Sequence, residues 1–159
     1  MNITLLCLGR LKEEYLRQAC SEYEKRLGAF CKFNAEVLEP EKLSDNPSDT
    51  EVENALKKEG ERLMKKIPPG SFVCALCIEG KQPSSEELAL RLEKIPLEGY
   101  GQGVFIIGSS YGLSAEVKNA AHLKLSMSKM TFPHQLARVM LMEQIYRGYS
   151  IINNRKYHK

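Results

Sequence analysis

Strand-like and helix-like segments alternate along the chain, and this order constrains the fold more than any other feature of the sequence. The short apolar runs that predict strands are residues 3–8, 33–38, 72–78, 103–107 and 123–127. The segments that predict helices lie between and after them, at residues 12–27, 51–67, 84–94, 114–121 and 133–149. An alternating order of this kind predicts an α/β fold, in which a mostly parallel sheet carries helices on both faces.

The chain is predicted to form one domain, residues 1–159, because it contains no internal repeat, low-complexity tract or linker. No apolar run approaches the roughly 20 residues that span a bilayer. Met1 opens a strand-like segment rather than a basic leader with a cleavage site. Five cysteines are an odd number, which does not suit a disulfide framework and indicates a reducing compartment. We therefore expect a cytoplasmic protein that does not enter a membrane.

Cys74 and Cys77 form a Cys-x-x-Cys spacing inside a predicted strand. Residues three apart in a strand point to opposite faces of the sheet. No second Cys or His pair accompanies them, as a structural zinc site requires. We therefore predict buried strand cysteines and no metal site.

Charge is distributed unevenly along the chain, although the net charge of +3 is small. Residues 36–61 carry nine acidic and three basic side chains, whereas residues 122–159 carry seven basic side chains and one acidic. A basic C-terminal surface is typical of proteins that bind a polyanion. A solvated basic surface that binds nothing shows the same pattern, so charge alone leaves both interpretations open.

Three loops follow predicted strands, and ligands of open α/β sheets bind outside the carboxyl ends of strands. They are residues 79–81, 108–112 and 126–134. The second loop has Gly108 and Gly112 at a strand-to-helix turn, where glycine lets the backbone approach a ligand closely. It matches neither the G-x-G-x-x-G fingerprint nor a P-loop, which disfavours hydride and ATP chemistry.

The third loop joins a buried strand to an apolar helix and contains two serines, a threonine and a lysine. The backbone groups of such a compact loop suit a flat polar ligand such as adenine. His134, at the start of the helix, is either a base or a residue that makes local hydrogen bonds.

Arg138 and Arg147 lie nine residues apart on the last predicted helix, so they do not share one narrow face. Arg147 has the spacing to pair with Glu143, which would leave Arg138 to face a ligand. The tail Tyr157-His158-Lys159 combines an aromatic ring, an imidazole and a cation, which is a combination that grips single-stranded RNA. An ordinary terminus that frays is the alternative.

Taken together, these residues resemble the RlmH family, the bacterial pseudouridine N3-methyltransferases of large-subunit ribosomal RNA, which are minimal SPOUT-class enzymes. The likeness extends from the first predicted strand to the last residue. The matching blocks are Glu22-Tyr23-x-x-Arg26, Lys58-Glu59-Gly60, Gly108-x-x-x-Gly112-Leu113, Leu125-Ser126-x-Ser128-Lys129-Met130-Thr131-Phe132-Pro133-His134-Gln135, Arg138-Val139, Glu143-Gln144-x-Tyr146-Arg147 and Tyr157-His158-Lys159.

The resemblance implies a SPOUT-type domain whose C-terminal part threads into a trefoil knot, and a homodimer with each cofactor pocket near the dimer interface. It implies S-adenosylmethionine as the cofactor and 23S ribosomal RNA in the ribosome as the substrate. Carried over by position, the cofactor-binding residues are Leu76, Gly108, Met127, Ser128, Lys129, Met130, Thr131 and Phe132. Substrate contacts are expected at Arg138 and at Tyr157, His158 and Lys159.

The implied reaction is transfer of a methyl group to N3 of a pseudouridine. Its N3–H lies between two carbonyl groups and is mildly acidic, so loss of the proton creates the nucleophile. Arg138 is the cation expected to stabilise the developing anion, because a guanidinium stays protonated. His158 is the candidate base, because imidazole titrates near neutral pH.

This chain departs from the family pattern at Ser109, where relatives often carry a second glycine after Gly108. A serine can still donate its backbone N–H, so we expect an intact pocket. Two other functions stay open: a non-catalytic RNA- or ribosome-binding protein, and a SPOUT methyltransferase that acts on transfer RNA. Because the chain has no separate RNA-binding domain, we expect it to modify assembled ribosomes rather than free transfer RNA.

Overall fold

The computed structural model describes residues 1–158 and contains a five-stranded sheet in the order β2-β1-β4-β3-β5. All four neighbouring strand pairs are parallel, which confirms the predicted α/β class. The elements are β1 (Asn2–Leu8), α1 (Glu14–Leu27), β2 (Lys32–Leu38), α2 (Asp49–Lys65), β3 (Ser71–Lys81), α3 (Ser85–Leu97), β4 (Gln102–Ile107), α4 (Ala115–Ala120), β5 (Leu123–Leu125) and α5 (His134–Ile152).

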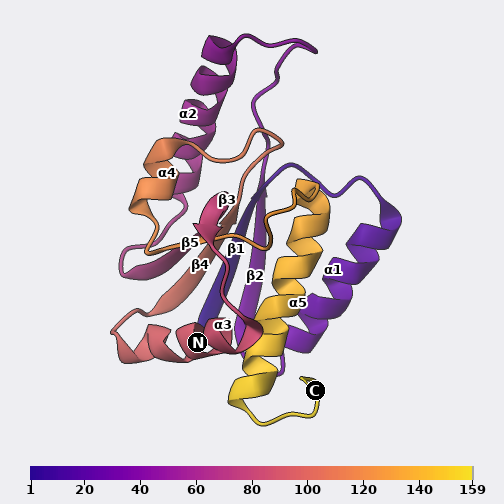
Figure 1. The fold of residues 1–159 in the computed structure, drawn as a ribbon, viewed down its shortest axis with the longest axis vertical. Coiled ribbons are helices and arrows are strands. Elements are labelled where there is room, and N and C mark those ends of the chain that lie inside the picture. Colours follow the sequence, from indigo (N-terminus) through magenta and orange to yellow (C-terminus); the bar gives the residue numbers. More distant parts are fainter. Residues whose placement is uncertain (159) are drawn as a thin grey trace.

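Helices cover both faces of the sheet, and alternate strand residues supply the two cores. Along β1, Ile3 and Leu5 belong to the core under α1, α3 and α5, whereas Leu6 and Leu8 belong to the core under α2 and α4. This period of two is the pattern of a strand buried on both faces. Figure 1 shows α1 and α5 running side by side, with α2 and α4 on the other side of the sheet.

Two boundaries differ from the prediction, the start of α2 and the end of β5, and a specific hydrogen bond sets each of them. α2 begins at Asp49 rather than Glu51, because Ser48 and Glu51 form a reciprocal capping box. β5 ends at Leu125 rather than Met127. The Ser126 N–H bonds to the Lys81 carbonyl oxygen at 2.8 Å, and the chain then leaves the sheet.

The longest described helix, α5, opens after Pro133 as predicted and continues to Ile152. It contacts α1 and α3 along one face of the sheet. The helix begins near the ends of β3, β4 and β5 and leads to the C-terminal tail. Among the described residues, no helix is both long and apolar enough to cross a membrane. The single-domain organisation and the trefoil knot stay predictions.

Candidate functional site

A cavity of about 610 Å³ opens where the carboxyl ends of β3 and β4 meet the loop between β5 and α5. This is the edge at which open α/β sheets bind their ligands. The side chains that line it are mostly apolar, with hydroxyl, carboxylate and ammonium groups among them. The lining residues are Leu76–Glu79, Ile107–Leu113, Lys118, Ser126–Ser128, Met130–His134 and Ala137.

The glycine turn after β4 forms one wall of this cavity. A Cβ on Gly108 would lie 2.1 Å from the Gly112 carbonyl oxygen, so only glycine fits there. Gly112 has φ of +87°, and its N–H donates to the Ser109 carbonyl oxygen at 2.9 Å. The two glycines predicted from the sequence therefore have separate tasks, because Gly108 permits a close approach and Gly112 permits the left-handed conformation.

The loop between β5 and α5 forms the opposite wall and is held by its own serines. Ser126 Oγ donates to the Ser128 carbonyl oxygen at 2.9 Å, and the Met130 N–H donates to Ser128 Oγ at 3.0 Å. Side-chain hydrogen bonds of this kind stabilise a turn without a helix or sheet ladder. The polar composition noted in the sequence therefore supports the loop's own shape as well as the wall of the cavity.

An irregularity in β3 carries part of that strand to the rim of the cavity. Leu76 and Lys81 both pair with Leu125 of β5, so the residues between them bulge out of the ladder. A Cβ on Gly80 would lie 2.6 Å from the backbone of Leu125, so glycine lets β3 and β5 approach each other closely there. As a result, Cys77 lies at the cavity and is half-buried, while Cys74 is in the core.

The structure brings the predicted cofactor residues together at this cavity with one exception. Seven of them line it, namely Leu76, Gly108, Met127, Ser128, Met130, Thr131 and Phe132. Lys129 is exposed and is not among the lining residues. Their role in binding a cofactor stays a prediction.

His134 lies at the first turn of α5, on the wall of the cavity. Burial, and then the positive charges of Arg138 and Lys12, lower the pKa of His134 below its ordinary value of 6.5. The imidazole is therefore neutral at physiological pH, and a neutral imidazole can accept a proton.

Arg138 lies beneath the cavity instead of on its wall. It is 4% exposed, and its Nη2 donates to the Gly9 carbonyl oxygen at 2.6 Å. Its Nε has no hydrogen-bond partner among the described residues. The guanidinium ties the end of β1 to α5. The catalytic role of Arg138 stays a prediction.

The described part of the tail, Tyr157 and His158, folds back against the middle of α5. The Tyr157 hydroxyl donates to Glu143 Oε1 at 3.1 Å, and its ring meets the Tyr146 ring edge-on with centroids 4.8 Å apart. His158 Nε2 lies 2.7 Å from Glu86 Oε1 at the start of α3. Lys159, the third predicted substrate residue, lies outside the described residues.

The predicted pair between Arg147 and Glu143 is confirmed, with Nη2 and Oε1 2.6 Å apart. Arg147 also covers the Tyr157 ring at 4.7 Å and lies 3.4 Å from His158 Nδ1. Arg147 lies about 20 Å along the helix axis from His134. The tail is therefore anchored well away from the cavity of its own chain.

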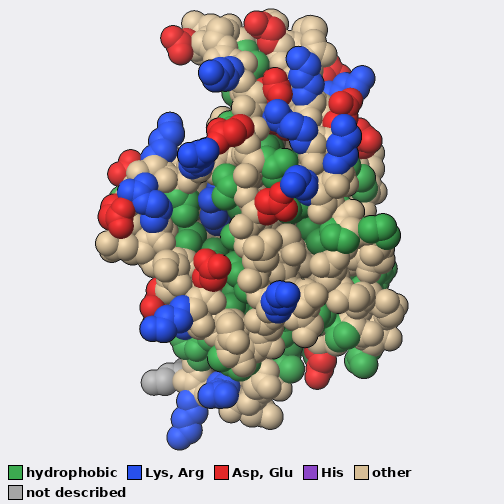
Figure 2. Space-filling model, turned by 180° about the vertical axis from the view of Figure 1, so that it is seen from behind, with side chains coloured by type: hydrophobic (Ala, Val, Ile, Leu, Met, Phe, Trp, Pro, Cys, Tyr) green, Lys and Arg blue, Asp and Glu red, His purple; other side chains and the backbone are tan. Residues whose placement is uncertain are grey.

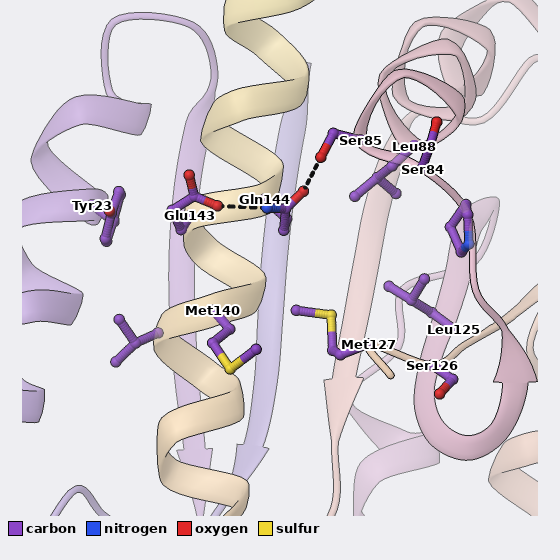
Figure 3. A pocket seen from close by; sticks show the side chains of 12 residues that line it. Tyr23, Ser84, Ser85, Leu88, Leu125, Ser126, Met127, Met140, Glu143 and Gln144 are labelled. Atoms are coloured by element: carbon purple, nitrogen blue, oxygen red, sulfur yellow. Dashed lines mark hydrogen bonds between the residues drawn. The ribbon is translucent and has the colours of Figure 1, made fainter. Parts of the chain in front are cut away.

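A second hollow of about 490 Å³ separates the tail from the cavity, between α5, the start of α3 and the Ser126–Met127 segment. Figure 3 shows Gln144 at its wall, hydrogen-bonded to Ser85 and to Glu143 at 2.7 Å each. Met127 lines both the hollow and the cavity. The two spaces therefore share a wall.

One residue at the cavity that lies outside the loops and blocks singled out from the sequence is Lys118. Lys118 of α4 pairs with Glu79 across the rim at 2.6 Å, and Tyr111 is 48% exposed on the glycine turn. Glu59 of α2 is buried behind the same turn. The Gly60 beside it was a usable signal, since glycine inside a helix often marks a close packing contact.

Acidic side chains of residues 36–61 form ion pairs with cations outside that segment. Arg10 pairs with Glu39 at 2.9 Å, Arg62 pairs with Glu41 at 2.9 Å, and Lys66 pairs with Glu36. Figure 2 accordingly shows acidic and basic side chains interspersed over the upper end of the molecule, where α2 lies. At the other end, Arg155 and Lys156 are exposed. Among residues 1–158, no group of three or more His, Cys, Asp or Glu side chains could hold a metal ion.

Comparisons with known proteins agree with this geometry. A family model described as "Predicted SPOUT methyltransferase" matches residues 1–158. The chain is 48% identical over 159 residues to "Ribosomal RNA large subunit methyltransferase H" of Exiguobacterium sibiricum, with all of both chains covered. It is 49% identical to the protein of the same name from Clostridium beijerinckii, again with complete coverage of both.

Among solved structures, a probable methylase family protein from Haemophilus influenzae Rd KW20 superposes with a TM-score of 0.51 at 13% identity. The superposition covers 99% of this chain and 70% of that one, and it supports the fold alone. The resemblance inferred from the sequence blocks is confirmed by the family model and the full-length relatives. The chain belongs to the SPOUT methyltransferase family, among the ribosomal RNA large subunit methyltransferases H.

Proposed function

We propose that this protein transfers a methyl group from S-adenosylmethionine to N3 of a pseudouridine in 23S ribosomal RNA within the ribosome. The observation that carries the proposal is the cavity at the ends of β3 and β4, which gathers seven of the eight residues expected to bind the cofactor. Full-length relatives named ribosomal RNA large subunit methyltransferase H support the ribosomal substrate.

The cavity suits S-adenosylmethionine in size and in chemistry. Its volume of about 610 Å³ falls within the usual range of roughly 300–1,000 Å³ for small-molecule sites. Leu76, Met127 and Phe132 offer apolar surface to an adenine ring, and the turn from Gly108 to Gly112 closes tightly because Gly108 carries no side chain. When bound, the sulfonium of the cofactor supplies an electrophilic methyl group.

Two imidazoles are candidates for accepting the N3 proton. His134 lies on the cavity of its own chain and is neutral at physiological pH. His158 is bound to Glu86 and Arg147, and its own cavity lies about 20 Å away along α5. His158 can therefore act at a cavity only if that cavity belongs to a second copy of the chain.

We propose a homodimer in which the tail of one copy completes the cavity of the other. α5 supports this assembly, because Leu136, Val139 and Met140 form an incompletely buried apolar stripe between the cavity and the tail. Leu136 is 39% exposed, and exposed apolar surface next to a site is typical of an interface. A symmetric dimer places each tail near its partner's cavity in the same way.

The test combines a binding measurement with a reaction. Titration calorimetry with S-adenosylhomocysteine should show saturable binding, and ribosomes from a strain lacking this protein should gain one methyl group, mapped by mass spectrometry to a pseudouridine. Absence of binding at millimolar ligand would favour a non-catalytic ribosome-binding protein. Methylation of free transfer RNA instead of ribosomes would favour a transfer RNA enzyme.

A further inference from the structure

Glu59 is a buried carboxylate that links two loops next to the cavity. The residue lies on α2 and is 3% exposed. Its Oε1 accepts a hydrogen bond from the Glu41 N–H at 2.9 Å, and its Oε2 accepts one from the Ser109 hydroxyl at 3.1 Å. Ser109 follows Gly108 in the glycine turn, so the carboxylate supports the back of the cavity wall.

The neighbouring residue, Gly60, holds α2 close enough for this contact. A Cβ at Gly60 would lie 2.3 Å from Ser114 Oγ and 3.3 Å from the Val117 side chain. Ser114 caps α4, which begins directly after the glycine turn. The pair Glu59-Gly60 therefore meets both ends of the segment 108–114, one residue by hydrogen bonding and the other by close packing.

Each contact of Glu59 compensates for the burial of its charge. Burial raises the pKa of Glu59, and the hydrogen bonds from Glu41 and Ser109 oppose that rise. Arg62, the nearby cation, pairs instead with Glu41 and with the Glu39 carbonyl oxygen. A buried acceptor that loses its donor costs more free energy than the hydrogen bond itself contributes. The Ser109 hydroxyl is therefore held firmly by Glu59.

We propose that Glu59 is a positioning residue for cofactor binding, and that it acts through the Ser109 hydroxyl to hold the glycine turn in its binding conformation. This inference rests on the proposed function, since it assigns a role within the proposed cofactor site. Glu59 lies behind the turn and is not among the residues that line the cavity, so it acts on affinity without touching the ligand.

The experiment compares Ser109→Ala, Glu59→Leu and the double variant, with Glu61→Leu as the matched control because Glu61 is an exposed carboxylate on the same helix. Titration calorimetry gives the Kd of S-adenosylhomocysteine. Steady-state kinetics on ribosomes give kcat and the KM for S-adenosylmethionine, and thermal melting gives Tm. Both single variants should raise Kd and KM by about tenfold, because the bond lost is one to a charged group. At saturating cofactor, kcat should stay at the wild-type value.

The double variant should bind about as weakly as either single variant, because both changes break the same link. A wild-type Kd for Ser109→Ala, or effects of the two changes that simply add, would overturn the inference. A fall in Tm with unchanged Kd would also overturn it, because it would make the contact purely structural. If Glu59→Leu fails to fold, Ser109→Ala alone decides. Failure of the proposed function is distinguishable, since the wild-type protein itself would then bind no S-adenosylhomocysteine.

Discussion

The two ends of α5 belong to different parts of the proposed machinery. At its start, His134 and Ala137 join the loop 126–133 and the glycine turn to line the cavity. Further along, Glu143 and Arg147 hold the tail against the helix, on the far side of the second hollow from the cavity. The first region gathers the residues expected to bind the cofactor, whereas the second carries the residues expected to contact RNA and lies about 20 Å away along the helix.

Substitutions in the two regions should therefore impair different steps, namely cofactor binding and methyl transfer. Changes at the cavity should weaken cofactor binding, because they act on groups that line it. Changes at the tail should leave cofactor binding intact and reduce methyl transfer, because the proposed dimer places the tail at the cavity of the other copy. Each prediction below tests one side of that separation.

Removing residues 157–159 should reduce the single-turnover rate of methyl transfer on ribosomes by about a thousandfold. Loss of a proton acceptor and of substrate positioning has effects of this order. The Kd of S-adenosylhomocysteine, measured by calorimetry on the same preparation, should stay within about twofold of wild type. A parallel loss of cofactor binding would show that the tail belongs to the cofactor site.

Gly108→Ala should weaken S-adenosylhomocysteine binding on the order of a hundredfold, because the new Cβ would lie 2.1 Å from the Gly112 carbonyl oxygen. Calorimetry measures the effect. Gly101→Ala is the matched control, since a Cβ there meets nothing within 4 Å. Equal affinities for the two variants would mean that the glycine turn does not hold the cofactor.

Glu143→Gln should lower methyl transfer by about tenfold and leave cofactor affinity unchanged. The substitution removes the charge that binds Arg147 and leaves only a neutral amide oxygen to accept from the Tyr157 hydroxyl, so the tail is held less tightly. Glu24→Gln, an exposed carboxylate on α1, serves as the control. If the tail acted as a free strand of chain, Glu143→Gln would match the control.

The smallest effect is the pH dependence contributed by His134. Its pKa in the folded protein is lowered from 6.5 by burial and by the charges of Arg138 and Lys12, so the unfolded chain binds more protons near that pH. Stability should therefore fall as pH drops below about 6.5. His134→Gln should reduce this loss in melting experiments. A titration of the imidazole by NMR that gave a pKa above 6.5 would contradict the assignment.

The fold and the place of the cavity were predictable because they follow from local patterns. Strand residues alternating between two cores and the glycines at Gly108 and Gly112 are visible in the sequence, and their geometry follows from the properties of the backbone. The role of Arg138 was harder to predict, because its contact with the Gly9 carbonyl oxygen joins residues 129 positions apart. The support from Glu59 depends in the same way on a distant contact with Ser109. Long-range hydrogen bonds leave no period in the sequence.

The most direct test mixes two inactive variants, one lacking residues 157–159 and one carrying Gly108→Ala. After unfolding and refolding together, about half of the dimers should contain one chain of each kind, and each mixed dimer should have one intact cavity served by one intact tail. The account predicts that the mixture recovers methyl transfer on ribosomes to about a quarter of the wild-type rate per site. A mixture that forms mixed dimers and stays inactive would contradict it.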